Sequence, residues 1–170
     1  ISCEDARCGS QSIYTLADSS GDAASSTDAR GNVFLAETTE TLDEFSVFVD
    51  PESICEVDFY VLSRSDLTSD WDIEYASSDL TSAGEQWMSS GVIGIAMDEG
   101  NYYALVYGWD CELTYYYDAL AGSSTMDGGF GTSWGRWYDT AFSSSYSGSV
   151  DDVATDYPDT RYYMTVSVSR

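Results

Sequence analysis

The residues of this chain that could carry chemistry are its carboxylates. Asp and Glu together number 30, whereas histidine and lysine are absent and all six basic residues are arginines. A pair of Asp or Glu side chains can hydrolyse a glycosidic bond, and carboxylate oxygens are ligands that calcium prefers. The composition excludes serine–histidine and cysteine–histidine nucleophile systems, Schiff bases on lysine and imidazole metal sites.

Paired carboxylates make a small glycoside hydrolase the first hypothesis to weigh. Glu56, Glu74 and Glu112 lie on or beside segments that we expect to be strands, where they could face a cleft. With 30 acidic residues, however, carboxylate pairs at suitable distances arise by chance. The strand motifs expected around a glycosidase nucleophile are also missing. We therefore expect a protein that is not an enzyme.

Calcium is the one cofactor that the sequence predicts. Asp18, Asp22 and Asp28 cluster in a segment rich in glycine and serine, residues 19–30, which we expect to be a long surface loop. Carboxylates and backbone carbonyls could converge there on a hard cation. The segment does not match an EF-hand, and the alternative is an acidic loop that is only solvated.

Aromatic residues supply a third candidate site. Trp134, Trp137 and Tyr138 surround Arg136, and such a group could hold a sugar ring or an aromatic side chain of a partner. The structural alternative, which we favour, is that the two tryptophans fill the ends of the fold. Tyr116 joins the candidate binding residues, because alternation along the run of three tyrosines exposes the middle one.

The bulk composition limits the partners and the organisation of the chain. A formal charge of −24 repels phosphate backbones, so nucleic acid is excluded as a partner. A hydrophobic content of 43% with 15% aromatic residues is too high for a disordered acidic chain. No apolar stretch is long enough to insert into a membrane. We expect one domain over residues 12–170, preceded by an N-terminal segment over residues 1–11.

Short segments with a period of two recur between Gly, Ser and Asp turns, which is typical of strands. They predict an all-β fold in which two antiparallel sheets form a jelly-roll-like sandwich. A second long loop is expected over residues 141–156. The expected strands are residues 12–16, 33–37, 44–49, 55–63, 71–76, 86–89, 92–97, 102–109, 111–117, 132–138 and 161–169.

The four cysteines predict two disulfides and an oxidising compartment. Cys3 and Cys8 are close enough to close a small loop in the N-terminal segment. Cys55 and Cys111 each open an expected strand on its apolar face, so they can join two strands across the core. A zinc site built from four thiolates is the rival interpretation, but the spacing lacks paired C-x-x-C motifs.

The pattern of strands and turns also resembles a known class of module. Residues 31–34, 41–50 and 96–104, followed by Gly108-Trp109 and Tyr115-Tyr116-Tyr117, are similar to the secreted jelly-roll modules of bacterial cell-surface and adhesin-type proteins. The similarity spans residues 32–138. The resemblance implies secretion and a role at the cell surface.

Together these features give a leading hypothesis and an alternative. The leading one is a secreted structural subunit of an extracellular surface assembly, a filament or adhesive layer, that self-associates through strand and aromatic contacts. Its acidic faces would point to solvent or be bridged by calcium. The alternative is a carbohydrate-binding module that holds a glycan on its tryptophans.

Overall fold

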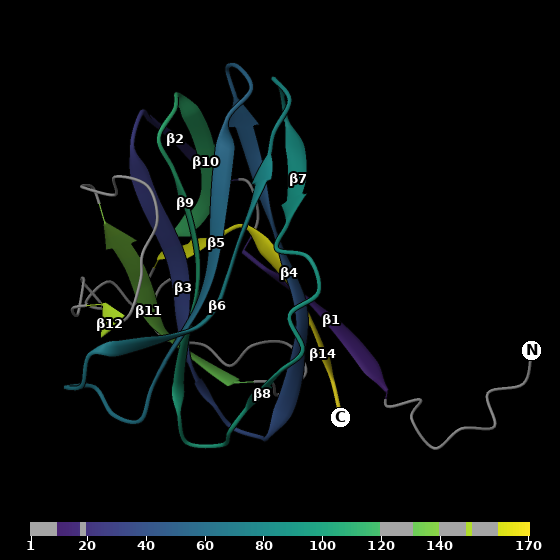
Figure 1. Ribbon diagram of the computed structural model, residues 1–170, viewed down its shortest axis with the longest axis vertical. Coiled ribbons are helices and arrows are strands. Elements are labelled where there is room, and N and C mark those ends of the chain that lie inside the picture. The colour runs from purple at the N-terminus through teal and green to yellow at the C-terminus, as the bar shows by residue number, and fades with distance from the viewer. Residues whose placement is uncertain (1–9, 18–19, 120–130, 140–148, 151–159) are drawn as a thin grey trace, which may run out of the picture.

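The computed structural model describes residues 10–17, 20–119, 131–139, 149–150 and 160–170. In them the chain forms two antiparallel sheets that pack as a sandwich (Figure 1). This confirms the predicted all-β, two-sheet architecture. No helix in these residues has the length and apolar character needed to cross a membrane.

The larger sheet has eight strands, and β4 is its longest. Its path runs β1-β14-β4-β10-β13, with β2 beside β10 and with β7 and β8 beside β4. Its strands are β1 (Gln11–Leu16), β2 (Gly21–Ser25), β4 (Glu40–Pro51), β7 (Gln86–Ser89), β8 (Ile95–Met97), β10 (Leu113–Ala119), β13 (Thr160–Tyr162) and β14 (Met164–Ser169).

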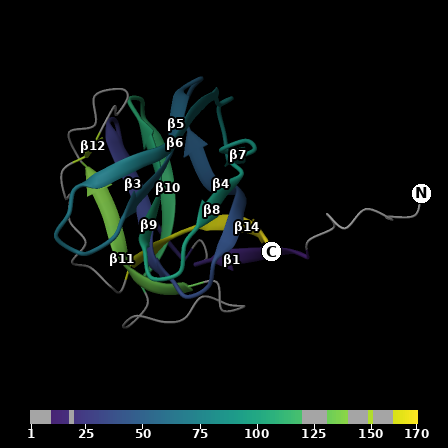
Figure 2. The same cartoon turned by 60° about the horizontal axis from the view of Figure 1, so that its bottom comes forward.

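The smaller sheet has six strands in the order β11-β3-β9-β5-β6-β12. The chain crosses repeatedly from one sheet to the other, as it does in jelly-roll sandwiches. In both ribbon views β1, β4 and β7 lie on the side away from β11 and β12 (Figures 1 and 2). The strands are β3 (Asp28–Ala36), β5 (Glu56–Arg64), β6 (Trp71–Leu80), β9 (Tyr102–Trp109), β11 (Gly131–Asp139) and β12 (Ser149–Val150).

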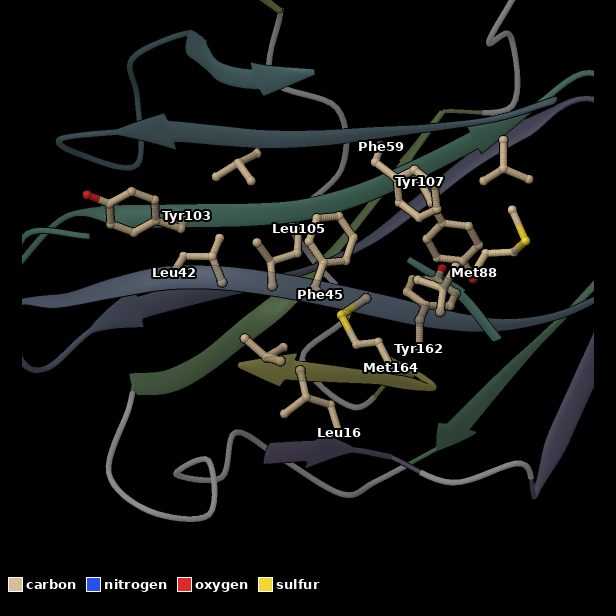
Figure 3. Close-up of a cluster of buried hydrophobic side chains, with 14 of the residues drawn as sticks. Leu16, Leu42, Phe45, Phe59, Met88, Tyr103, Leu105, Tyr107, Tyr162 and Met164 are labelled. Atoms are coloured by element: carbon tan, nitrogen blue, oxygen red, sulfur yellow. The ribbon is translucent and has the colours of Figure 1, made fainter. Parts of the chain in front are cut away.

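The main core lies between the sheets and is built by the alternation that the sequence predicts. Phe45 of the larger sheet and Phe59 of the smaller one meet edge to face, with ring centroids 5.7 Å apart. Figure 3 shows side chains from both sheets pointing toward one another in this layer. The predicted inward residues of the last strands are all buried: Tyr162, Met164, Val166 and Val168.

The smaller sheet also buries residues on its other face. In β9, Leu105 and Tyr107 belong to the main core, whereas Ala104 and Val106 belong to a second cluster. This second cluster contains Trp71 and Trp137, both fully buried, along with Ala29, Val33, Tyr60 and Leu62. The sequence of a strand that is buried on both faces is a continuous run of apolar residues, and the sequence of β9 is such a run.

A disulfide joins the two sheets. Cys55 lies just before β5 and Cys111 just before β10, and their Cα atoms are 6.0 Å apart. This confirms the predicted pair, and both cysteines in the described part of the chain are used by it. Cys3 and Cys8 lie outside the described residues.

Asn32 makes a second link between the sheets. Its side chain is fully buried in β3, where Nδ2 donates to the Tyr162 carbonyl and Oδ1 accepts from the Tyr162 N–H, both at 2.9 Å. Tyr162 belongs to β13, at the end of the path through the larger sheet. The side-chain amide of Asn32 therefore supplies the two hydrogen bonds that the backbone of β13 would otherwise make with a neighbouring strand.

Two short strands lie inside segments that the sequence predicts to be loops, and both predictions need correction. β2 (Gly21–Ser25) pairs with β10, and β3 already begins at Asp28, so residues 19–30 are not one long loop. β12 (Ser149–Val150) pairs with β6 within the segment 141–156. The backbone of β10 and β6 offers pairing partners that a local reading of Gly- and Ser-rich sequence does not reveal.

Candidate functional site

Four aromatic rings gather on the outer face of the eight-stranded sheet, and we call them the four-ring cluster. They are Phe48 of β4, Trp87 of β7, Tyr116 of β10 and Tyr163, which lies between β13 and β14. The Phe48 ring is 5.3 Å from Trp87, 5.1 Å from Tyr116 and 5.7 Å from Tyr163, centroid to centroid. Trp87 and Tyr163 are 4.9 Å apart.

The register of the strands places these rings together. In β4, Phe45, Val47 and Val49 face the core, so Phe48 must face outward. Phe48 pairs directly with Trp87 across β4 and β7. Tyr163 lies in the break between β13 and β14. The Tyr163 carbonyl accepts a hydrogen bond from the Phe48 N–H at 3.3 Å.

The cluster is open to solvent mainly through Trp87, which is 42% exposed. Phe48, Tyr116 and Tyr163 are half-buried beneath and beside it. An exposed tryptophan packed between two other rings, Phe48 and Tyr163, is a preformed apolar platform, because the packed rings restrict its rotation. This platform is the strongest candidate for a binding surface in the described residues.

Carboxylates surround the Tyr116 end of the cluster. The Tyr116 hydroxyl donates to Glu85 at 3.0 Å. Burial, the bond to Glu85 and the nearby carboxylates of Asp50 and Asp22 raise the pKa of Tyr116 to about 12. Tyr116 therefore stays a neutral hydrogen-bond donor at any physiological pH.

A shallow groove of about 160 Å³ lies along β4, where one of its lining residues, Ser46, is two positions from Phe48. It is lined by Gln11 and Ile13 of β1, by Glu44, Phe45 and Ser46 of β4, and by Thr165 and Ser167 of β14. Ser46 pairs with Ser89 on one side and with Thr165 on the other. A row of hydroxyl groups thus crosses the sheet two positions from the Phe48–Trp87 pair, or about 7 Å along the strand.

Glu44 is held in a fixed orientation within this row. Its Oε1 accepts hydrogen bonds from Ser89 at 2.6 Å and from Ser46 at 3.4 Å. Across the groove, Gln11 Nε2 donates to Ser167 at 2.8 Å. The groove therefore presents hydroxyl, amide and carboxylate groups whose positions are set by neighbouring side chains.

No residue of the groove or of the four-ring cluster is basic. The described arginines are used elsewhere. Arg30 pairs with Asp28, Arg64 lies 4.2 Å over the Trp71 ring, Arg136 lies over Tyr138, Arg161 donates to Ser133, and Arg170 pairs with Glu40. The outer face of the larger sheet consequently combines rings and hydroxyls with negative charge.

The structure separates the aromatic residues that the sequence groups around Arg136. Trp137 is fully buried in the second cluster, so it belongs to the core and not to a binding surface. Trp134 is 38% exposed and packs on Tyr102 at 5.6 Å. Tyr138 lies between two guanidinium groups, 5.5 Å from Arg30 and 4.8 Å from Arg136.

The candidate calcium ligands are placed on different strands. Asp28 is buried and forms an ion pair with Arg30; burial raises its pKa, and Arg30 opposes this. Asp22 is exposed on β2, opposite Tyr116, and Asp18 lies outside the described residues. Over the described ranges, no three acidic, cysteine or histidine side chains are close enough to hold a metal ion. Calcium binding by this segment stays a prediction.

The three glutamates considered for hydrolysis do not line the groove along β4. Glu74 accepts a hydrogen bond from Ser63 at 2.6 Å on the exposed side of β6. Glu56 and Glu112 are exposed. These contacts are those of solvated carboxylates.

Asp58 of β5 should make the protein less stable as the pH rises. Burial, together with Glu56 and Asp110, raises its pKa from 3.8 to about 6. The folded chain thus keeps a proton that the unfolded chain releases, so stability falls between about pH 4 and pH 6. We expect Asp58→Asn to raise the free energy of unfolding at pH 7.5 by on the order of 1 kcal/mol, since solvent screens part of the effect. Urea denaturation followed by tryptophan fluorescence measures it.

Asp66 provides the control of opposite sign. Its carboxylate accepts hydrogen bonds from Thr68 and Ser69, which lower its pKa. Asp66→Asn should therefore destabilise the protein at pH 7.5, and the difference should shrink as the pH falls. Equal stability of wild type and Asp58→Asn at both pH 4 and pH 7.5 would contradict the assignment.

Most of the four-ring cluster is not predicted by local sequence patterns. Alternation identifies Tyr116, but Phe48, Trp87 and Tyr163 come together only through the pairing of β4 with β7 and the break after β13. One local signal exists. Phe48 is the aromatic residue on the otherwise polar face of β4, between Ser46 and Asp50.

The sequence matches no protein-family model and no curated protein. Among solved structures, the fold is similar to part of the clostridial cysteine protease Cwp84, in a form obtained after propeptide cleavage. The TM-score is 0.57 at 12% sequence identity, and the alignment covers 94% of this chain and 40% of that chain. This likeness shows the fold alone: a β-sandwich of this kind occurs within a larger bacterial protein.

Proposed function

We propose that this chain is a secreted, non-enzymatic structural module of an extracellular surface assembly, and that it attaches through the outer face of its eight-stranded sheet. The observation that carries the proposal is the four-ring cluster, with Trp87 42% exposed on a rigid sheet. Aromatic residues in preformed surface positions are the usual anchors of binding interfaces.

Other features support the location and the lack of catalysis. The disulfide between Cys55 and Cys111 favours an oxidising compartment outside the cytosol. The chain has no histidine or lysine, and the glutamates considered for hydrolysis are exposed. A module that acts by contact fits these properties better than one that acts on a bond.

Self-association into a filament is a second candidate, supported by a second aromatic pair. Trp134 and Tyr102 pack together on the smaller sheet, and Trp134 is 38% exposed. Aromatic patches on the two opposite sheets could join copies head to tail, and a head-to-tail contact that does not close gives a filament.

The proposal is tested by the retention of purified protein on washed extracellular surface material from the cells that produce it. We expect retention of wild type and a loss of about tenfold or more for Trp87→Ala, since truncating a hot-spot anchor costs about 2 kcal/mol or more. Trp134→Ala is the matched control, because it removes a similarly exposed tryptophan from the opposite sheet.

Sedimentation of the same variants at high protein concentration separates the two candidates. Retention that depends on Trp87 alone, with a monomeric protein, supports attachment. Oligomers lost in both Trp87→Ala and Trp134→Ala support the filament. If the wild-type protein is monomeric and is not retained, both candidate functions are wrong.

A further inference from the structure

We infer that the occupant of the outer face is a neutral polysaccharide chain, with one sugar ring on Trp87 and the following part of the chain along the groove beside β4. This inference rests on the proposed function and names the partner of the same surface. Three properties of the face lead to it: the shape of the aromatic platform, the polar groups beside it and the sign of its charge.

The platform suits the flat, apolar face of a sugar ring. Trp87 is fixed from two sides, by Phe48 at 5.3 Å and by Tyr163 at 4.9 Å, and both rings are tilted against it. The four rings therefore pack on one another as one continuous aromatic surface. Such a platform can contact the apolar face of a sugar ring laid on it.

The groove provides hydrogen-bond partners where the next hydroxyl groups of a polysaccharide would lie. Ser46, Ser89 and Thr165 form the row nearest to the platform, and Glu44 and Ser167 lie further along the strands. Both hydrogen bonds that Glu44 accepts go to Oε1, so its Oε2 can accept from a ligand hydroxyl. Side chains that are already oriented lose less entropy when a ligand binds.

The charge of the face selects against anionic glycans. Asp22, Asp50 and Glu85 lie near Tyr116, and Glu44 lies in the groove. No basic residue of the groove or the cluster balances them. Uronic acids and sulfated sugars would be repelled by this field, whereas neutral hexoses would not.

A bound peptide strand fits the same face less well. Strand addition uses free backbone groups at a sheet edge, but β4 and β14 are interior strands whose backbones pair on both sides. What the face offers is side chains: rings, hydroxyls, one amide and carboxylates. These groups recognise a ligand that has many hydroxyl groups and apolar ring faces.

Two measurements test the inference. The first is affinity electrophoresis in gels containing a neutral glucan, mannan or xylan, with polygalacturonate and heparin as anionic counterparts. The second is retention on the producing cells' surface material before and after periodate oxidation, which cleaves sugar diols, and before and after protease digestion. We expect retardation by a neutral polysaccharide but by neither anionic one, and retention that periodate abolishes and protease leaves intact.

Variants connect the binding to the face. Trp87→Ala should weaken retardation about tenfold or more, and Glu44→Gln by a smaller factor, whereas Trp134→Ala should behave as wild type. If Trp87→Ala does not fold, Ser167→Trp fills the groove and leaves the cluster intact, and it should also abolish retardation. Thermal unfolding of each variant shows that the fold is kept.

The outcomes separate this inference from the function on which it rests. Retention that depends on Trp87, survives periodate and is lost after protease would overturn the polysaccharide and keep the attachment function, with a protein as the partner. Absence of retention on untreated material would overturn the attachment function itself. Retardation by the anionic polymers alone would overturn the charge argument.

Discussion

Replacing Cys55 and Cys111 together with alanine is expected to lower the free energy of unfolding by about 4 kcal/mol. The bond closes a loop between residues 56 positions apart, and removing it gives back the entropy of that loop to the unfolded chain. The loss also removes the covalent link between the two sheets at the point where β5 and β10 begin. Urea denaturation at neutral pH, without reductant, measures the difference.

The double variant changes only the Cys55–Cys111 bond, which neither a single replacement nor a reductant does. A single replacement would leave one free thiol able to form disulfides with other cysteines, and reductant would act on every disulfide in the chain. The expected signature is a lower urea midpoint with a larger dependence on urea, because the unfolded chain becomes less compact. A loss below about 1 kcal/mol would show that the unfolded chain stays compact without the bond.

Asn32→Ala is expected to cost about 3 kcal/mol, which is large for the loss of one polar side chain. The substitution removes two hydrogen bonds of 2.9 Å and leaves the Tyr162 N–H and carbonyl buried without their partner. An unsatisfied buried polar group costs about 1–3 kcal/mol. Chemical denaturation gives the change, and amide hydrogen exchange at Tyr162 shows whether the loss is local.

Asn101→Ala is the matched control, because Asn101 is the other asparagine of the chain. It is half-buried in a turn, where its backbone N–H donates to the Asp98 carbonyl at 3.2 Å. This bond does not need the side chain, so the expected change is within about 0.5 kcal/mol. Equal effects of the two substitutions would mean that Asn32 does not link the sheets.

Local patterns predict those parts of the fold in which each strand's own residues alternate or form an apolar run. The expected bounds of β7 and β9 match the structure, and the disulfide is found because its cysteines lie in sequence register with the apolar faces of β5 and β10. β2 is missed because Gly, Asp, Ala and Ser have low strand propensity. It forms because β10 offers its backbone for pairing.

The candidate site depends on contacts that local patterns do not contain. Tyr116 is predicted because alternation is a local property. The faces on which the two β11 tryptophans lie are harder to predict, because the pairing of β11 with β3 shifts register between Ser133 and Gly135. Such a shift changes which face the following residues occupy. It places Trp137 opposite Gly31 in the second cluster, while Trp134 contacts Tyr102.

The positions of the arginines have a consequence for survival outside the cell. Arg30, Arg64, Arg136 and Arg161 all lie within strands, and Arg64 and Arg161 are buried. Digestive enzymes of the trypsin type cut after arginine or lysine and need an accessible, flexible stretch of chain. Arg64 ends β5 beside an exposed turn, but the side chain that such an enzyme must bind is buried there, so this sandwich should outlast many secreted proteins in a medium rich in these enzymes.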